Sequence, residues 1–173
     1  LSRKESRVAA REILTGLIER VLPRLDGLRS QIIHGDVHPQ NMIVDPESPT
    51  RITGIIDFGD ILHASIAQDV GNLANEFLIS PETVADNLAA CVRGYAGVTP
   101  LEPEEIGLLY DLTLGRAILL PLINRYRQVE TPDNGGYLQS YGENTMDRIA
   151  ALRQIGRVEV TEMLRRVCLP RTF

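Results

Sequence analysis

Two short stretches of the sequence decide the fold: residues 34–41 read His-Gly-Asp-Val-His-Pro-Gln-Asn, and residues 55–60 read Ile-Ile-Asp-Phe-Gly-Asp. The carboxylate of Asp36 precedes the carboxamide of Asn41 by five positions in a polar loop. A second carboxylate, Asp57, ends a hydrophobic segment and comes shortly before a glycine. Oxygen-bearing side chains of this kind suit Mg²⁺, which is usually shared between a few protein oxygens, water and substrate phosphates.

Phosphoryl transfer requires this combination of groups. Metal ions neutralise the charge on the β- and γ-phosphates, while a carboxylate that is free of metal orients the attacking hydroxyl and accepts its proton. An Asp-x-x-x-x-Asn spacing followed by Asp-Phe-Gly is the catalytic signature of the protein-kinase fold. The pattern therefore indicates a kinase-like site.

The His-Gly-Asp-x-His-x-x-Asn form, with Ile-Asp-Phe-Gly-Asp downstream, resembles the aminoglycoside phosphotransferase and choline kinase superfamily. Within it, the motifs are most similar to hydroxylysine kinase and to kinase domains fused to class III aminotransferases in bacteria. The resemblance implies an α+β, mainly helical fold. We expect residues 1–173 to form one domain, the C-terminal lobe of the kinase-like fold, with a small β-hairpin region carrying the catalytic loop.

The resemblance also assigns roles to individual residues. It implies that Asp36 is the catalytic base and that Asn41 and Asp57 bind Mg²⁺, with ATP as the co-substrate. It further implies that His34 braces the catalytic loop against the turn that contains Asp57 and Gly59.

Three more residues resemble supporting positions of the family. Asp69 corresponds to an aspartate that accepts backbone hydrogen bonds from the catalytic loop, so we expect a structural role. Asp60 would face the site and contact the metal or a substrate amine. His38 either lies near the phosphates or satisfies a hydrogen bond within the loop, and the sequence leaves both open.

Two other interpretations of these residues are available. Asp and Asn favour turns, so each residue alone could be a turn residue. Alternatively, His34, Asp36 and His38 could form a metal cluster for hydrolysis, since alternate residues of an extended segment share a face. Only one further histidine, His63, could support the cluster, and it leaves Asn41 and the Asp-Phe-Gly triplet unexplained.

Hydrophobic periodicity predicts the elements around the motifs. We expect a helix ending at Pro23, then short strands, then helices for the rest of the chain, including a long one kinked at Pro121. The predicted helices cover residues 8–22, 66–79, 81–95, 103–127 and 143–167, and the predicted strands cover residues 31–33, 42–44 and 51–56.

Composition excludes several classes of partner. The chain has 18 Lys and Arg against 23 Asp and Glu, a net charge of −5, and no basic stripe, so we expect no nucleic-acid partner. No targeting or membrane segment is visible. The two cysteines, Cys91 and Cys168, lack metal-ligand spacing, which favours reduced thiols in a cytoplasmic protein.

The groups that clamp ATP in kinases are not recognisable here. A glycine-rich loop, a strand lysine and its glutamate partner belong upstream of the catalytic loop. Only 33 residues precede His34, and the single lysine, Lys4, opens a predicted helix. We therefore expect this chain to be inactive alone and to need the N-terminal lobe of a parent protein. An aminotransferase fused to that parent protein is a second candidate partner.

The expected reaction transfers the ATP γ-phosphoryl group to a hydroxyl of a small amine-bearing metabolite, such as an amino alcohol. A non-catalytic docking module within a larger protein is the alternative.

Overall fold

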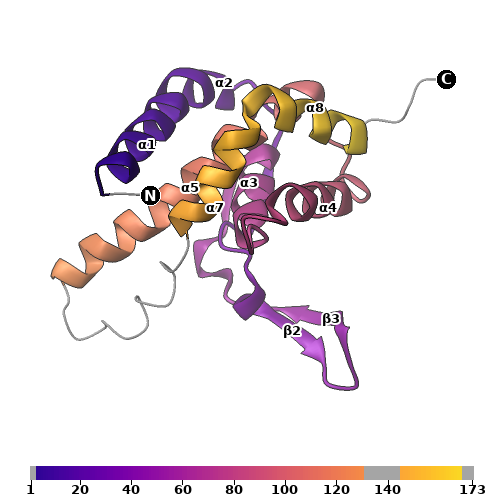
Figure 1. Cartoon of the computed structure of the whole chain (residues 1–173). Helices are drawn as coiled ribbons and strands as arrows, with labels where there is room; N and C mark the ends of the chain where they lie inside the picture. The colour runs from indigo at the N-terminus through magenta and orange to yellow at the C-terminus, as the bar shows by residue number, and fades with distance from the viewer. Residues whose placement is uncertain (1–2, 131–144, 169–173) are drawn as a thin grey trace.

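The computed structural model describes residues 3–130 and 145–168. Figure 1 shows a body of packed helices from which a β-hairpin projects on one side. The elements that begin the chain are α1 (Arg3–Gly16), η1 (Leu17–Val21), α2 (Leu22–Leu25) and β1 (Ser30–Ile33). This arrangement confirms a mainly helical α+β fold, whereas its assignment as a C-terminal kinase lobe stays a prediction.

The first helix does not end at Pro23, so that prediction was wrong. The chain widens into the π-helical turn η1 and then continues as α2, with Pro23 in the first turn of α2. Proline is tolerated there because the first amide groups of a helix have no carbonyl partner within it.

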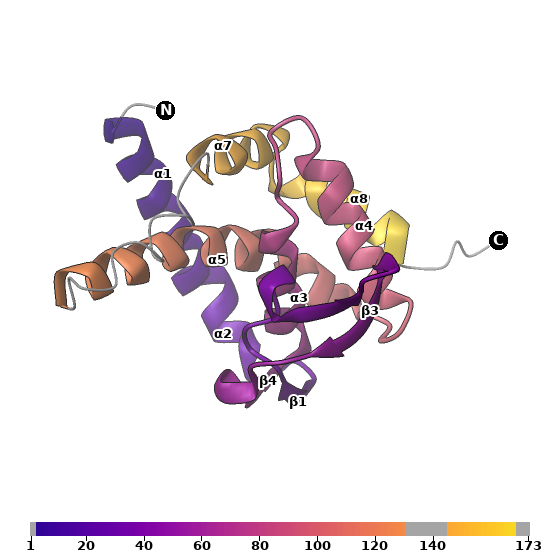
Figure 2. The same cartoon turned by 90° about the horizontal axis from the view of Figure 1, so that it is seen from below.

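The strands form two separate antiparallel pairs. β2 (Met42–Asp45) and β3 (Ser48–Ile55) make the projecting hairpin, with Met42 opposite Ile55. β1 pairs with β4 (Leu62–Ser65), a strand that the sequence did not predict, and Ile33 lies opposite Leu62. Both pairs lie at the edge of the helical body in Figure 2. The catalytic-loop motif therefore runs from the end of one sheet to the start of the other.

Helix α3 (Ile66–Glu76) begins with a capping box, in which the Ser65 side chain accepts from the helix backbone and Gln68 accepts from the Ser65 amide. Helix α4 (Val84–Ala96) begins three residues later than predicted, since residues 81–83 form a turn. Helix α5 (Pro103–Glu130) continues through Pro121.

The last predicted helix is in fact two helices, α7 (Thr145–Ile155) and α8 (Arg157–Cys168). They are separated by Gly156, whose φ of +92° is the left-handed conformation that commonly ends a helix.

The core lies between the helices, with α5 at its centre. Leu109 and Leu114 of α5 are buried together with Leu88 of α4, Ile149 of α7 and Leu164 of α8. The Pro103–Asn124 part of α5 is long and apolar enough to cross a bilayer, but 56% of its most apolar window is buried inside the protein. The same composition is expected of a core helix.

Two ion pairs fasten the N-terminal segment to α5. Arg29 donates to both carboxylate oxygens of Glu105, at 2.9 and 2.6 Å, and the Glu105 side chain is fully buried. Arg20 donates to both oxygens of Asp111, at 3.1 and 2.6 Å. Because bidentate pairs fix geometry, they hold the segment leading into β1 against the core.

Candidate active site

The loop that carries Asp36 depends on Gly35. Gly35 has a φ of +82°, and a Cβ atom at this position would lie 2.4 Å from the backbone oxygen of Asp60. The backbone of the loop therefore packs directly on the turn after β3, which only glycine permits. From α3, Asn72 Nδ2 donates to the Gly35 oxygen at 3.2 Å.

His34 joins the loop to the end of the hairpin. Its Nε2 lies 2.9 Å from the carbonyl oxygen of Ile56, and the amide of Asp36 lies 3.4 Å from its Nδ1. Since a carbonyl only accepts and an amide only donates, the ring carries its proton on Nε2. The ring also contacts Phe58, with centroids 4.8 Å apart. His34 therefore contacts both motifs, and its predicted role as a brace of the catalytic loop stays a prediction.

Asn41 is the second connection between the motifs. Its Nδ2 donates to the backbone oxygen of Asp36 at 3.0 Å, and its own backbone oxygen accepts from the amide of Ile56 at 3.0 Å. The residue is only 6% exposed. Because the amide nitrogen is used by the loop, the side-chain oxygen of Asn41 is the atom left for a ligand.

Asp57 directly follows Ile56, whose amide donates to the backbone oxygen of Asn41. Its backbone is left-handed, with φ 64° and ψ 63°, and it precedes the 3₁₀ turn η3 (Phe58–Asp60). Non-glycine residues in this conformation are uncommon and occur often at functional sites. A Cβ at Gly59 would be 3.5 Å from Asp57 Oδ1, so the carboxylate lies over the glycine.

The oxygen atoms near this junction fit a magnesium ion. Asp57 is exposed, and within residues 3–130 and 145–168 it makes no hydrogen bond or ion pair through its carboxylate. Carboxylate and amide oxygens are the types of donor that Mg²⁺ takes when substrate phosphates and water complete its shell, and the predicted roles of Asn41 and Asp57 as ligands stay predictions.

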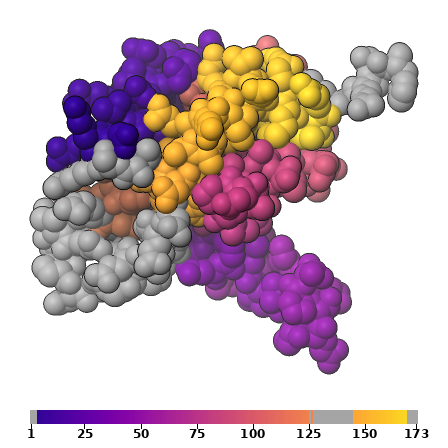
Figure 3. Space-filling model, viewed as in Figure 1, coloured from indigo at the N-terminus to yellow at the C-terminus, as the bar shows by residue number. Residues whose placement is uncertain are grey.

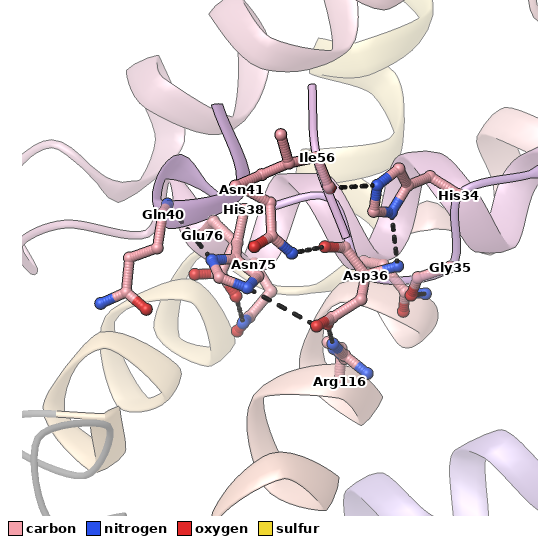
Figure 4. A network of polar contacts seen from close by, with 11 residues as sticks. His34, Gly35, Asp36, His38, Gln40, Asn41, Ile56, Asn75, Glu76 and Arg116 are labelled. Carbon is pink, nitrogen blue, oxygen red and sulfur yellow. Dashed lines mark hydrogen bonds and ion pairs between the residues drawn. The ribbon is translucent and has the colours of Figure 1, made fainter. Parts of the chain in front are cut away.

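Asp36 is held from the side by α5. Arg116 Nη2 donates to Asp36 Oδ1 at 2.5 Å, and His38 Nε2 lies 3.5 Å from Asp36 Oδ2. Figure 4 shows the carboxylate directed toward Arg116, with the His38 ring facing its other oxygen. Sequence reasoning missed Arg116. The available signal was an arginine at the border of the most apolar stretch of α5.

His38 also accepts a hydrogen bond within its own loop, from the Gln40 amide to Nδ1 at 3.3 Å. His38 thus makes a contact within its own loop, and its second ring nitrogen faces Asp36. Which of the two predicted roles it has, near the phosphates or within the loop, stays a prediction.

Asp69 lies in α3 behind the loop. Burial raises the pKa of Asp69 above its usual value, while hydrogen bonds from the Tyr95 hydroxyl and the Gly35 amide act in the opposite direction. The Tyr95 oxygen is 3.4 Å from Asp69 Oδ2. These contacts agree with a carboxylate that supports the loop, which stays a prediction.

Asp60 contributes its backbone, not its side chain, to the loop contact. Its carbonyl oxygen faces Gly35, and the residue is exposed. Its predicted contact with metal or substrate stays a prediction.

Comparison with known proteins agrees with this geometry. Residues 2–106, more than half of the chain, match the family described as phosphotransferase enzyme family. The chain belongs to this phosphotransferase family. It is similar to a hydroxylysine kinase of Danio rerio, 29% identical over 155 residues, which cover 86% of this chain and 44% of that protein.

Other relatives of this chain are named for a different kinase activity. A homoserine kinase of Rhizobium etli (strain CIAT 652) is 27% identical over 164 residues, covering 88% of this chain and 50% of that protein. A homoserine kinase of Chelativorans sp. (strain BNC1) is 32% identical over 120 residues, covering 68% and 35%. The chain thus spans about half the length, or less, of these curated relatives.

The interpretation as a metal-dependent hydrolase gains no support from the described residues. Among the residues that the structure describes, no group of three or more His, Cys, Asp or Glu side chains could hold a metal ion. His63 lies on β4 opposite Ile32, and His34 uses both ring nitrogens for backbone contacts.

Proposed function

We propose that this chain is the catalytic part of an ATP-dependent small-molecule kinase. The observation that carries the proposal is the continuous set of hydrogen bonds from Asp36 through Asn41 to the residue preceding Asp57. Those bonds connect the loop that carries Asp36 and Asn41 to the segment that leads into Asp57. Membership of the phosphotransferase family supports the same chemistry.

In the proposed reaction, Asp36 orients a substrate hydroxyl and accepts its proton. The hydroxyl oxygen forms a bond to the γ-phosphorus of ATP, the bond from that phosphorus to the bridging oxygen breaks, and ADP leaves. Arg116 lies 2.5 Å from Oδ1 of Asp36, whereas His38 lies 3.5 Å from Oδ2, so we assign Oδ2, the oxygen with the longer contact, to the acceptor hydroxyl. Most of the rate effect would come from positioning and charge neutralisation.

Asn41 and Asp57 would hold Mg²⁺ through their side-chain oxygens. When bound there, the ion would supply positive charge that neutralises the phosphates during transfer. Within the chain, the left-handed backbone of Asp57 and the hydrogen bond from the Ile56 amide to Asn41 keep both donors at one junction.

An N-terminal lobe would cover the exposed apolar surface around the β-hairpin. The large hydrophobic side chains exposed there are Ile32, Ile43, Val44, Ile52, Ile55, Ile56, Phe58, Ile61 and Leu62. The hairpin projects from the helical body (Figure 3). Because a large apolar patch usually marks an interaction site, and the relatives are about twice as long, we assign this surface to the ATP-clamping lobe of the same cytoplasmic protein.

The test is phosphoryl transfer by the protein that carries this chain together with that lobe. It would be incubated with γ-labelled ATP, Mg²⁺ and small amino alcohols or hydroxy amino acids. We expect labelled product from the parent protein and a loss of at least about a hundredfold in Asp36→Asn. Asp86→Asn, an exposed carboxylate on α4, is the matched control. No transfer to any hydroxyl acceptor would contradict the proposal and favour a docking module.

A further inference from the structure

A small pocket opens beside the candidate active site, between the end of α3, the middle of α5 and the start of α7. Its volume is ≈ 150 Å³, and its lining includes Asn75, Glu76, Leu120 and Arg148. The pocket combines polar groups with apolar atoms of α5. Its position and charges indicate what it would bind.

The pocket begins one helical turn from both groups that hold the Asp36 loop. Asn72 of α3 bonds to Gly35, and Asn75 and Glu76 follow it by three and four residues, so all three share a helix face. On α5, Arg116 bonds to Asp36, and Leu120 follows it by four residues. Since one turn rises about 5.4 Å, a short molecule in the pocket could extend a hydroxyl to Asp36. Figure 4 shows Asn75 and Glu76 in the same view as Asp36 and Arg116.

Glu76 gives the pocket a negative charge without a cationic partner among the described residues. Its Oε1 accepts a hydrogen bond of 2.9 Å from Asn75 Nδ2, a neutral donor that fixes the carboxylate without neutralising it. A fixed and uncompensated carboxylate is a suitable site for an ammonium group.

Arg148 gives the pocket a positive charge that has no anionic partner in the part of the chain that the structure describes. Its Nη1 donates to the Leu78 carbonyl at 2.6 Å, and its Nη2 donates to Thr145 Oγ1 at 3.0 Å. Both acceptors are neutral. Its Nε is buried and has no hydrogen-bond partner among residues 3–130 and 145–168. Each Nη carries a second N–H group, and these two donors suit a carboxylate.

The two charges line one pocket, and in the described part of the chain they do not form an ion pair with each other. We infer that this pocket binds the acceptor as a small hydroxy amino acid, with its ammonium at Glu76, its carboxylate at Arg148 and its hydroxyl directed toward Asp36. Leu120 and Pro121 provide apolar surface for the methylene groups. This inference rests on the proposed function. It adds that the acceptor carries a carboxylate and that Arg148 recognises this carboxylate.

Binding without ATP tests the inference apart from catalysis. L-homoserine would be titrated into the protein and followed by amide shifts in ¹H–¹⁵N NMR spectra, alongside two analogues. One analogue is 4-hydroxybutyrate, which lacks the amine, and the other is 2-amino-1,4-butanediol, which lacks the carboxylate. We expect L-homoserine to bind at least about tenfold more tightly than either, since charge-assisted hydrogen bonds each contribute a factor of this order. Equal binding of all three would overturn the inference.

Two variants assign each charge to its partner. Glu76→Gln keeps an oxygen for Asn75 and should weaken L-homoserine about tenfold while leaving 4-hydroxybutyrate unchanged. Arg148→Met should weaken L-homoserine similarly while leaving the aminodiol unchanged. Glu82→Gln and Arg166→Met, both exposed positions, are the matched controls. Because the ligand series uses the unaltered protein, it stands even if a variant fails to fold.

The outcomes separate this inference from the proposed function. If the protein transfers phosphate to alcohols in an Asp36-dependent way but does not prefer the zwitterion, only the pocket assignment is wrong. If L-homoserine binds with the expected preferences and no transfer occurs, the pocket assignment holds and the kinase proposal is wrong.

Discussion

Arg116 Nη2 lies 2.5 Å from Oδ1 of Asp36, although the two residues are 80 positions apart in the chain. The arginine comes from α5, the helix at the centre of the core, and its side chain is 22% exposed. The candidate base is therefore positioned by the most extensively packed helix of the protein as well as by its own loop.

Arg116 should act as a positioning residue. In the protein that carries the N-terminal lobe, Arg116→Ala should lower kcat about tenfold to a hundredfold with little change in the KM for ATP, because Asp36 would lose its fixed orientation. Steady-state kinetics of phosphoryl transfer measure both constants. Arg93→Ala, an exposed arginine on α4, should change neither. A rise in KM for ATP at constant kcat would show that Arg116 binds the nucleotide.

Gly35 should not tolerate a side chain. Gly35→Ala should lower the free energy of unfolding by about 2 kcal/mol or more, through the positive φ and the contact with the Asp60 oxygen. Gly107→Ala, in a helix with no atom within 4 Å of the new Cβ, should instead raise it by about 0.5 kcal/mol. Urea denaturation followed by circular dichroism gives both values. Similar effects of the two substitutions would contradict the packing of Gly35 on Asp60.

The Arg29–Glu105 pair should contribute far more to stability than an exposed pair. Arg29→Met leaves the fully buried Glu105 carboxylate without its cation, so we expect a loss of about 3 kcal/mol in the free energy of unfolding. Arg51→Met removes a 3.5 Å contact with Asp45 from a side chain that is 72% exposed, and should cost less than about 0.5 kcal/mol. Equal losses in urea denaturation would show that burial of Glu105 has no effect.

Cys91 should react slowly in the folded protein. Burial raises the pKa of the Cys91 thiol to about 11 from a usual value of 9.0, which lowers its thiolate fraction at pH 8 by about a hundredfold. In a Cys168→Ser background, alkylation by iodoacetamide at pH 8 should be about a hundredfold slower in the folded chain than in urea. The rate should rise with pH until about 11. Equal rates in the two states would contradict the burial of this thiol.

The sequence was sufficient to predict that the two motifs meet, whereas the roles of their residues stay predictions. Asp36, Asn41, Asp57 and His34 fall within these motifs, and the structure joins the motifs by backbone and side-chain hydrogen bonds. Hairpin pairing was also predictable, because the antiparallel register places the start of β2 beside the end of β3.

The parts that escaped prediction depend on long-range contacts or on competing local signals. No spacing rule connects Arg116 with Asp36, and β4 is only four residues long and is defined by its pairing with β1. Pro23 predicts a helix end because proline usually disrupts helices, whereas the π-helical turn before it allows the helix to restart. Gly156 is a recognisable signal for a helix end, but a single glycine is also tolerated inside a helix, so the sequence alone does not separate α7 from α8.

Asp36 is proposed as the catalytic base and Asp57 as a metal ligand, and these two roles can be measured separately. The most direct test combines two measurements on the complete kinase. Electron paramagnetic resonance gives its affinity for Mn²⁺ in the presence of ATP, and a transfer assay gives its rate of phosphoryl transfer. Asp57→Asn should weaken Mn²⁺ binding about tenfold or more, whereas Asp36→Asn should leave it within about twofold and still reduce transfer at least about a hundredfold. Equal loss of Mn²⁺ in both variants, or transfer that survives in Asp36→Asn, would contradict the account.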